Sequence, residues 1–143
     1  MRIVLDTSVL ITALRSPTGA SAELLRLAVK QRITLLGSLS LALEYLDVCA
    51  RAESRRATSV TEADALRFAN EVVAMLDPVE ISFRWRPASP DPGDDHVVET
   101  ALNGGAEAIV TFNARDFAQA SQRFGLPALP PADILRKLEA RDG

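Results

Sequence analysis

The sequence contains little cysteine and little histidine: Cys49 and His96 are the only residues of their kinds. A lone cysteine excludes an internal disulfide and any zinc site built from several thiolates. A catalytic triad based on an imidazole would have to use His96. The helical phase of its segment turns His96 outward, so we expect a solvated side chain there.

Long apolar runs are also absent. No segment approaches the length of a membrane span, and Met1-Arg2 leads directly into a short apolar stretch. We therefore expect a cytoplasmic protein that has no targeting segment and does not contact a membrane.

An excess of positive charge is missing as well. The chain has 16 Lys and Arg against 19 Asp and Glu, a net charge of −3 at pH 7, so no general positive field attracts polyanions. A polyanion would need a local basic strip or a bound cation. The charged fraction of 24% and the apolar fraction of 48% are ordinary for a globular protein. The length predicts a single domain, 1–143, with a substantial core.

Apolar strands alternate with amphipathic helices along the whole chain. Strands separated by helices imply parallel pairing through right-handed crossovers, so we predict an α/β fold. The predicted strands cover 2–6, 33–36, 79–81 and 108–110, with a weak one near 126–129. The predicted helices cover roughly 8–14, 21–31 with Ser21 as cap, 39–52 after a Ser38 cap, 61–76, 94–103, 114–121 and the chain from about 132.

Asp6 directly follows the apolar run Ile3-Val4-Leu5, which predicts a buried strand. The carboxyl ends of parallel strands form the ligand crevice of an open sheet. A carboxylate at that place points toward a site, at a desolvation cost that a cation would offset. The alternative is that Asp6 only caps the next helix, and this residue alone does not distinguish the two interpretations.

Glu44 lies in a predicted helix whose circumference is mostly apolar. It shares a narrow polar stripe with Asp47 and Arg51. Asp47 has a partner four residues on, Arg51, whereas Glu44 has none. Glu44 is therefore a candidate site residue, with an exposed surface glutamate as the alternative.

Asp94 and Asp95 stand together at a predicted helix start. Acids at this place can simply satisfy the helix N-terminus. The helical phase, however, places Asp94 at the centre of the inward face and Asp95 at its edge, so Asp94 is the better ligand candidate. Asp95 and Glu99 are weaker candidates for the same ligand role.

Thr111, Asn113 and Asp116 follow the fourth apolar strand in the same way. Asp116 has an alternative role as a cap or as a partner of Arg115. Acids at several strand-to-helix joints repel one another unless a cation binds among them. Oxygen ligands suit Mg²⁺ or Mn²⁺, and the matching chemistry is metal-assisted phosphodiester hydrolysis.

These motifs, taken in order, resemble the PIN-domain family, the ribonuclease fold of VapC-type toxins. The resemblance covers essentially the whole chain, including the closing segment 131–138. Each motif is short, but four in this order at appropriate distances are specific. They are Arg2-Ile-Val-Leu-Asp6-Thr-Ser8, Ser38 followed by Glu44, Asp94-Asp95-His96-Val97-Val98-Glu99, and Thr111-Phe112-Asn113-Ala114-Arg115-Asp116-Phe117.

The resemblance implies a three-layer α/β/α sandwich with a central parallel sheet of four to five strands. It implies a metal-dependent ribonuclease in which Asp6, Glu44 and Asp94 hold Mg²⁺ or Mn²⁺ and Asp116 completes the cluster. Either acid of the Asp94-Asp95 pair remains a candidate ligand. Ser8, Thr111 and Asn113 would orient ligands or water.

The same resemblance implies a toxin that cleaves RNA and is restrained by a small antitoxin, and it is compatible with a homodimer. The alternatives are a catalytically silent PIN-like module that binds RNA or protein, and a PIN nuclease of RNA processing outside toxin–antitoxin systems. The acid set, which is complete in this sequence, favours the enzyme.

Two arginine-bearing segments are further candidates for RNA contact. Arg51, Arg55 and Arg56 form either a local phosphate-binding strip or a solvated loop, which is the default. The segment 83–86, Phe-Arg-Trp-Arg, either stacks a base and holds a phosphate or is a strand end with its aromatic side chains packed inward. We favour the packed strand end.

Overall fold

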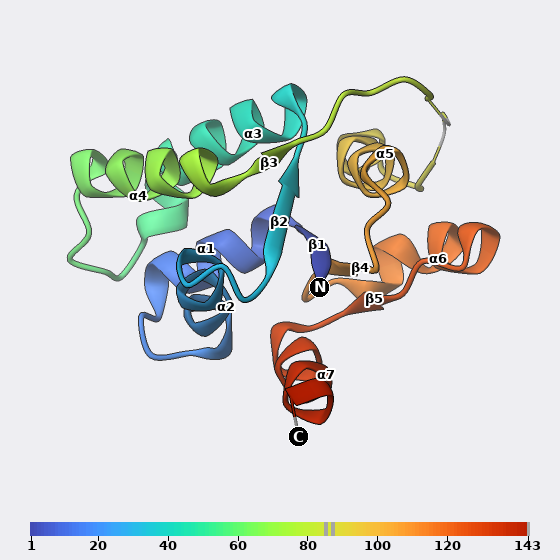
Figure 1. Cartoon of the computed structure of the whole chain (residues 1–143). Helices are drawn as coiled ribbons and strands as arrows, with labels where there is room; N and C mark the ends of the chain where they lie inside the picture. Colours follow the sequence, from blue (N-terminus) through green and yellow to red (C-terminus); the bar gives the residue numbers. More distant parts are fainter. Residues whose placement is uncertain (85, 87, 143) are drawn as a thin grey trace.

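The computed structural model describes residues 1–84, 86 and 88–142. A parallel sheet of five strands lies at its centre, in the order β3-β2-β1-β4-β5 (Figure 1). The middle strand, β1, is apolar and buried, as a strand covered on both faces must be. The predicted α/β fold with a parallel sheet is confirmed. The strands are β1 (Arg2–Leu5), β2 (Thr34–Gly37), β3 (Asp77–Pro78), β4 (Ala108–Val110) and β5 (Ala128–Leu129).

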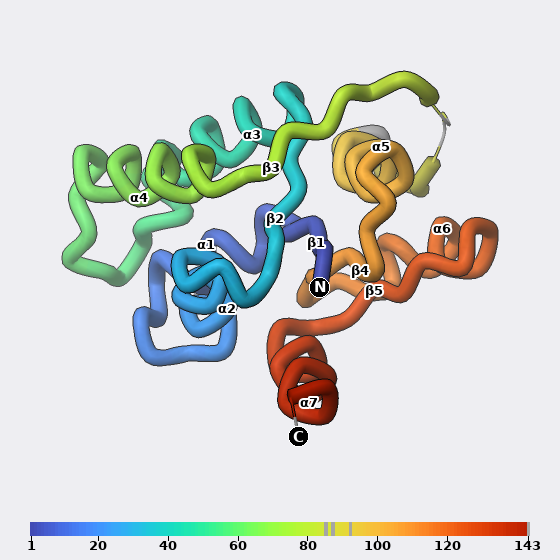
Figure 2. Tube along the Cα trace, viewed as in Figure 1, coloured from blue at the N-terminus to red at the C-terminus, as the bar shows by residue number. Residues whose placement is uncertain are grey.

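Helices cover the sheet on both sides. In Figure 1, α3, α4 and α5 lie on one side and α1, α2 and α7 on the other, and the tube in Figure 2 follows the same path. No helix in the described part of the chain is both long and apolar enough to cross a membrane. The α-helices are α1 (Thr7–Arg15), α2 (Ala20–Val29), α3 (Leu39–Ala50), α4 (Glu62–Met75), α5 (Asp95–Gly104), α6 (Ala118–Phe124) and α7 (Pro131–Asp142). The 3₁₀ helices are η1 (Ala52–Arg55), η2 (Pro92–Asp94) and η3 (Ala114–Phe117).

Two local expectations were wrong. The strand predicted at 79–81 lies earlier, as the two-residue β3. The Val79 backbone N–H still donates to the Gly37 carbonyl oxygen at 2.8 Å, but β2 ends at Gly37 and the chain continues into α3. Ser21 does not cap α2: Gly19 is the N-cap residue and Ser21 is a buried residue of the first turn. Both errors concern where an element begins, which depends on the neighbouring chain.

The strand register brings two of the polar joints together. Leu5 lies opposite Val110, so Asp6 and Thr111, which follow them, leave the sheet side by side. The Asp6 backbone N–H donates to the Val110 carbonyl oxygen at 2.9 Å. The joints after the first and fourth predicted strands are therefore neighbours, as expected for the carboxyl edge of a parallel sheet.

α3 packs against this same edge. Ser38 caps it, as predicted, by accepting a hydrogen bond from the Leu41 backbone N–H at 3.3 Å. Tyr45 is fully buried, and its hydroxyl donates to the Leu5 carbonyl oxygen, at the last residue of β1. This bond holds the helix against the end of β1 and places Glu44 beside the carboxyl edge.

A substitution at Gly37 tests the close packing of β2 against the end of α4. A Cβ atom at Gly37 would lie only 3.0 Å from Leu76 Cγ, so Gly37→Ala should lower the free energy of unfolding by about 1–3 kcal/mol through overpacking. Urea unfolding measures this loss. In a Leu76→Ala background Cγ and Cδ1 are removed and only the Leu76 Cβ, at 3.1 Å, remains, so the same substitution should cost clearly less. An equal loss in both backgrounds would contradict the packing described.

Candidate functional site

Asp6 joins the ends of β1 and β4 through its side chain. Its Oδ2 accepts hydrogen bonds from Ser8 Oγ and Thr111 Oγ1, each at 2.8 Å. The residue is 5% exposed, and its Oδ1 forms no hydrogen bond with any residue that the structure describes. Asp6 holds the N-cap position of α1, but its side chain accepts no capping bond. The Asp6 carboxylate therefore links the ends of β1 and β4 and does not cap α1.

The two hydroxyl groups beside Asp6 are held in turn by the backbone after β4. The Phe112 N–H donates to Ser8 Oγ at 3.3 Å, and the Asn113 N–H donates to Thr111 Oγ1 at 2.9 Å. Each hydroxyl thus accepts from the backbone and donates to Asp6. This arrangement fixes one oxygen of the carboxylate and leaves the other for a ligand.

Glu44 is half-buried on α3. Its Oε2 is buried and has no hydrogen-bond partner in the described part of the chain. Burial raises the pKa of Glu44 above its ordinary value; nearby His96 lowers the pKa and nearby Asp6 raises it. An exposed surface glutamate would not have these properties. A buried carboxylate oxygen without a donor needs a proton or a cation.

The raised pKa of Asp94 shows that several acidic side chains lie near one another at this site. Burial is the main cause that raises its pKa to about 6, and the charges of Asp6, Asp91, Asp116 and Glu44 raise it further. The acids predicted from separate segments of the sequence therefore act on one another in the folded chain. Mutual repulsion of this kind is relieved when a cation binds.

The burial of Asp94 and Asp95 is the reverse of what the helical phase predicted. Asp95 is the buried one, 3% exposed, whereas Asp94 is partly exposed. Asp95 Oδ1 accepts hydrogen bonds from the backbone N–H groups of Ala88 and Ser89 at 3.0 Å and from Ser89 Oγ at 3.1 Å. The phase failed because Asp94 belongs to the 3₁₀ turn η2, where 100° per residue does not apply.

Asp116 and Asn113 lie at the exposed side of this acid group, in and before η3. The Asp116 backbone N–H donates to the Asn113 carbonyl oxygen at 2.9 Å. Within the described residues, Asp116 forms no ion pair with Arg115. Its carboxylate acts on Asp94 instead, so the structure does not support the cap or ion-pair alternative.

The acid group offers only oxygen donors. Asp6 Oδ1 and Glu44 Oε2 lack protein partners within the described residues, which fits a hard divalent cation such as Mg²⁺ or Mn²⁺. Among the same residues, no three His, Cys, Asp or Glu side chains form a ready-made metal site. Mg²⁺ keeps several of its waters and is often held by one or two carboxylates, so it does not require three direct protein ligands.

The predicted arginine strip is only partly assembled. Arg51 and Arg56, together with Arg15, line a cavity of about 310 Å³ beside α1. Arg51 also forms an ion pair with Asp47 at 2.5 Å, as predicted. Arg55 turns to its own loop and donates to the Val60 carbonyl oxygen at 3.4 Å, so it does not line the cavity.

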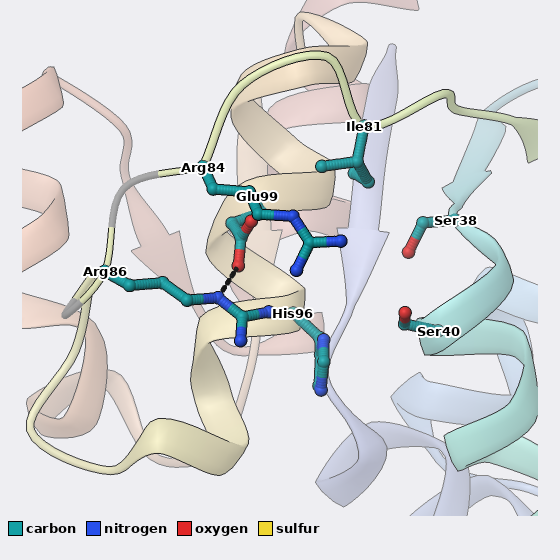
Figure 3. A pocket seen from close by; sticks show the side chains of 7 residues that line it. All are labelled: Ser38, Ser40, Ile81, Arg84, Arg86, His96 and Glu99. Carbon is teal, nitrogen blue, oxygen red and sulfur yellow. Dashed lines mark hydrogen bonds and ion pairs between the residues drawn. The ribbon is translucent and has the colours of Figure 1, made fainter.

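The segment 83–86 does not pack its first aromatic side chain inward. Phe83 is 66% exposed, contrary to our preferred interpretation, and Trp85 lies outside the described residues. Arg84 and Arg86 instead line a narrow hollow with His96 (Figure 3). His96, which we expected to be solvated, is only half-exposed and acts electrostatically on Glu44.

Sequence reasoning missed the partners of Tyr45 and Glu99. A tyrosine on the buried face of a helix signals that its hydroxyl requires an acceptor, but not that the acceptor is Leu5. Glu99 is 2% exposed and accepts a hydrogen bond from Arg86 Nε at 2.7 Å. No local pattern relates residues thirteen positions apart across a loop.

The family model of the PIN domain matches residues 2–115 of this chain. The chain belongs to the PIN-domain family. The match includes Asp6, Glu44 and Asp94 and ends just before Asp116. No curated protein sequence matches the chain.

Solved structures of similar fold support the PIN architecture. One is VapBC2 from Rickettsia felis bound to a DNA fragment from its promoter, with a TM-score of 0.60 and 14% identity over 90% of this chain and 97% of the other. Another is FitAB bound to the IR36 DNA fragment, with a TM-score of 0.56 and 15% identity over 90% and 94% of the two chains. At this level of identity the likeness concerns the fold, and the three-layer PIN sandwich is confirmed.

The pKa of Asp94 predicts a pH-dependent stability for this PIN domain without metal. The folded pKa of about 6 lies above the ordinary value of 3.8, so the folded state binds more protons between these values and stability falls as the pH rises through them. Asp94→Asn removes the charge. We expect it to raise the free energy of unfolding by about 1 kcal/mol above pH 7, a value reduced for partial exposure.

Urea unfolding in EDTA, at about pH 4.5 and pH 8, measures this effect. The gain should fall to about a third at the lower pH, because Asp94 is then neutral in the folded state but still mostly ionised in the unfolded chain. Asp64→Asn on the exposed start of α4 is the matched control and should show no gain at pH 8. An equal gain at both pH values would show that charge is not its cause.

Proposed function

We propose that this protein is a divalent-metal-dependent endoribonuclease that hydrolyses phosphodiester bonds in RNA. The supporting observation is the partly buried position of Asp94, whose pKa is raised first by burial and then by the charges of the neighbouring acids Asp6, Asp91, Asp116 and Glu44. Membership of the PIN-domain family supports nuclease chemistry at this edge. Carboxylates gathered where the parallel strands end suit a cation that binds a phosphate.

In this proposal Asp6, Glu44 and Asp94 would hold Mg²⁺ or Mn²⁺, directly or through water, and Asp116 would complete the group from its exposed side. The bound cation would supply an activated water and neutralise charge at phosphorus. Ser8 and Thr111 hold Asp6 in one orientation through their hydrogen bonds to Oδ2.

Between the paired acids, we propose Asp94 as the residue that faces the cation. Asp95 Oδ1 is already occupied by three donors from the loop before η2. Asp95 would thus position the loop and, through it, the start of α5. Asn113, exposed beside Asp116, would orient water or substrate by its amide.

We further infer that the nuclease is the toxin of a toxin–antitoxin pair, restrained by a small antitoxin protein. The similarity of fold to VapBC2 and FitAB, both solved with DNA, supports this role. A homodimer is compatible with it. A small protein encoded next to this gene is the antitoxin that this role predicts. Co-expression of the two proteins tests the role: we expect a stable complex and loss of ribonuclease activity.

RNA cleavage by the purified protein in Mg²⁺ or Mn²⁺ tests the enzymatic function. Asp6→Asn should reduce the cleavage rate at least about 100-fold, because the side chain loses its charge while the amide oxygen still accepts from Ser8 and Thr111. EDTA should abolish the activity of the wild-type protein. Asp133→Asn on α7 is the control and should cleave at the wild-type rate.

Equal cleavage by wild-type protein and Asp6→Asn would refute the assignment of the site. Absence of any cleavage, together with no thermal stabilisation by either metal, would instead favour a catalytically silent PIN module. Cleavage without any antitoxin partner would favour a PIN nuclease of RNA processing.

A further inference from the structure

A basic rim borders the acid group on the side of α5. We define this basic rim as Arg84, Arg86 and His96. With Ser38 and Ser40 at the start of α3, these residues surround a small hollow, and Figure 3 shows both guanidinium groups and the imidazole turned toward it. The enclosed space is about 10 Å³, enough for one water. A larger anion would therefore lie across the mouth of the hollow rather than inside it.

Arg86 is held in place by a buried partner. Its Nε donates to Glu99 Oε1 at 2.7 Å, and Glu99 is 2% exposed whereas the Arg86 side chain is 44% exposed. The ion pair occupies one edge of the guanidinium. The terminal nitrogens of Arg86 form no hydrogen bond with any residue that the structure describes, so they remain available to a ligand.

Arg84 has no such partner. It is exposed and forms neither an ion pair nor a hydrogen bond with the described residues. The hollow is thus lined by two guanidinium groups and one carboxylate, Glu99, so the two arginines give the rim a net positive charge. In a chain with a net charge of −3, this local excess is the feature that an anion would recognise.

The basic rim adjoins the proposed catalytic edge. His96 acts on Glu44 electrostatically, and it lies two positions after Asp94. Ser38, at the hollow, shares a hydrogen bond of 2.8 Å with Thr100 of α5, which joins α3 to α5 at this point. A strand of RNA whose backbone enters the acid group therefore passes close to these cations.

We propose that Arg84 and Arg86 bind a backbone phosphate of the RNA next to the bond that is hydrolysed. This inference rests on the proposed ribonuclease function and adds the substrate contact that the acid group cannot provide. Carboxylates repel the phosphates that flank the cleaved bond, so productive binding needs a cationic contact close by. Arginine is suited to this because its planar fork binds phosphate through two parallel hydrogen bonds.

The chemistry of the rim favours the backbone over the bases. Guanidinium contacts to phosphate position a strand without reading its sequence. We therefore expect the rim to raise affinity for single-stranded RNA of any sequence. Its contribution should weaken with salt, because each phosphate contact releases counterions.

Arg84→Gln tests the inference with little risk to folding, because the side chain is exposed and unpaired among the described residues. The matched control is Arg67→Gln on α4, which removes the same charge from a side chain that is 71% exposed. Both are made in the full chain carrying Asp6→Asn, so that the fluorescein-labelled single-stranded RNA used as probe stays intact. Fluorescence anisotropy in Mg²⁺ then gives Kd at several salt concentrations.

Arg84→Gln should raise Kd about fivefold and lower the slope of log Kd against log salt by about 0.7, the value for one phosphate contact with a single strand. Arg67→Gln should change neither quantity. In the cleaving protein, Arg84→Gln should raise KM with little change in kcat. Inorganic phosphate at matched phosphate concentration should displace little RNA; full displacement would indicate a site for a free anion instead.

Equal Kd and equal salt slope for Arg84→Gln and Arg67→Gln would overturn the inference, as would the absence of RNA binding by the reference protein. Failure of the proposed function is seen separately, as no metal-dependent cleavage by the wild-type chain. RNA binding that depends on Arg84 in a protein that does not cleave would leave the phosphate contact standing and refute only the enzyme.

Discussion

The hydrogen bonds that Asp6 Oδ2 accepts from Ser8 and Thr111 are the contact on which the site depends. The bond from Thr111 joins the ends of β1 and β4 and spans 105 residues of the chain. Together the two bonds orient a carboxylate that is almost completely buried. Burying a charge is costly unless hydrogen bonds or an opposite charge compensate. The two hydroxyls compensate one oxygen, and the proposed cation would compensate the other.

The rest of the carboxyl edge follows from this arrangement of charge. Glu44 and Asp94 both have raised pKa values because burial and neighbouring acids disfavour their ionised forms. The folded chain therefore carries an electrostatic strain at its site, and it remains folded because the apolar sheet and the Tyr45 contact hold the elements together. Stability and proposed activity thus oppose one another at the same residues, which is common where a site must bind a cation.

Most elements were predictable because their signals are local. The apolar run before Asp6, the Ser38 cap of α3 and the Gly105 stop of α5 each depend on a few adjacent residues. Asp94 and Asp95 were not predictable in detail, because the chain enters α5 through a 3₁₀ turn and the loop before it uses Asp95 as its acceptor. The ion pair between Arg86 and Glu99 was not predictable either, because it depends on the course of a loop.

The sequence by itself determined the parallel α/β fold, the family resemblance and the set of acids, because apolar periodicity and residue type are properties of short segments. Only the tertiary structure decided which acids meet. Strand register placed Asp6 beside Thr111, packing of α3 on Leu5 brought Glu44 to the same edge, and the path of the loop separated the roles of Asp94 and Asp95. These are contacts between distant segments, and their geometry is set by the packing of the whole domain rather than by any one motif.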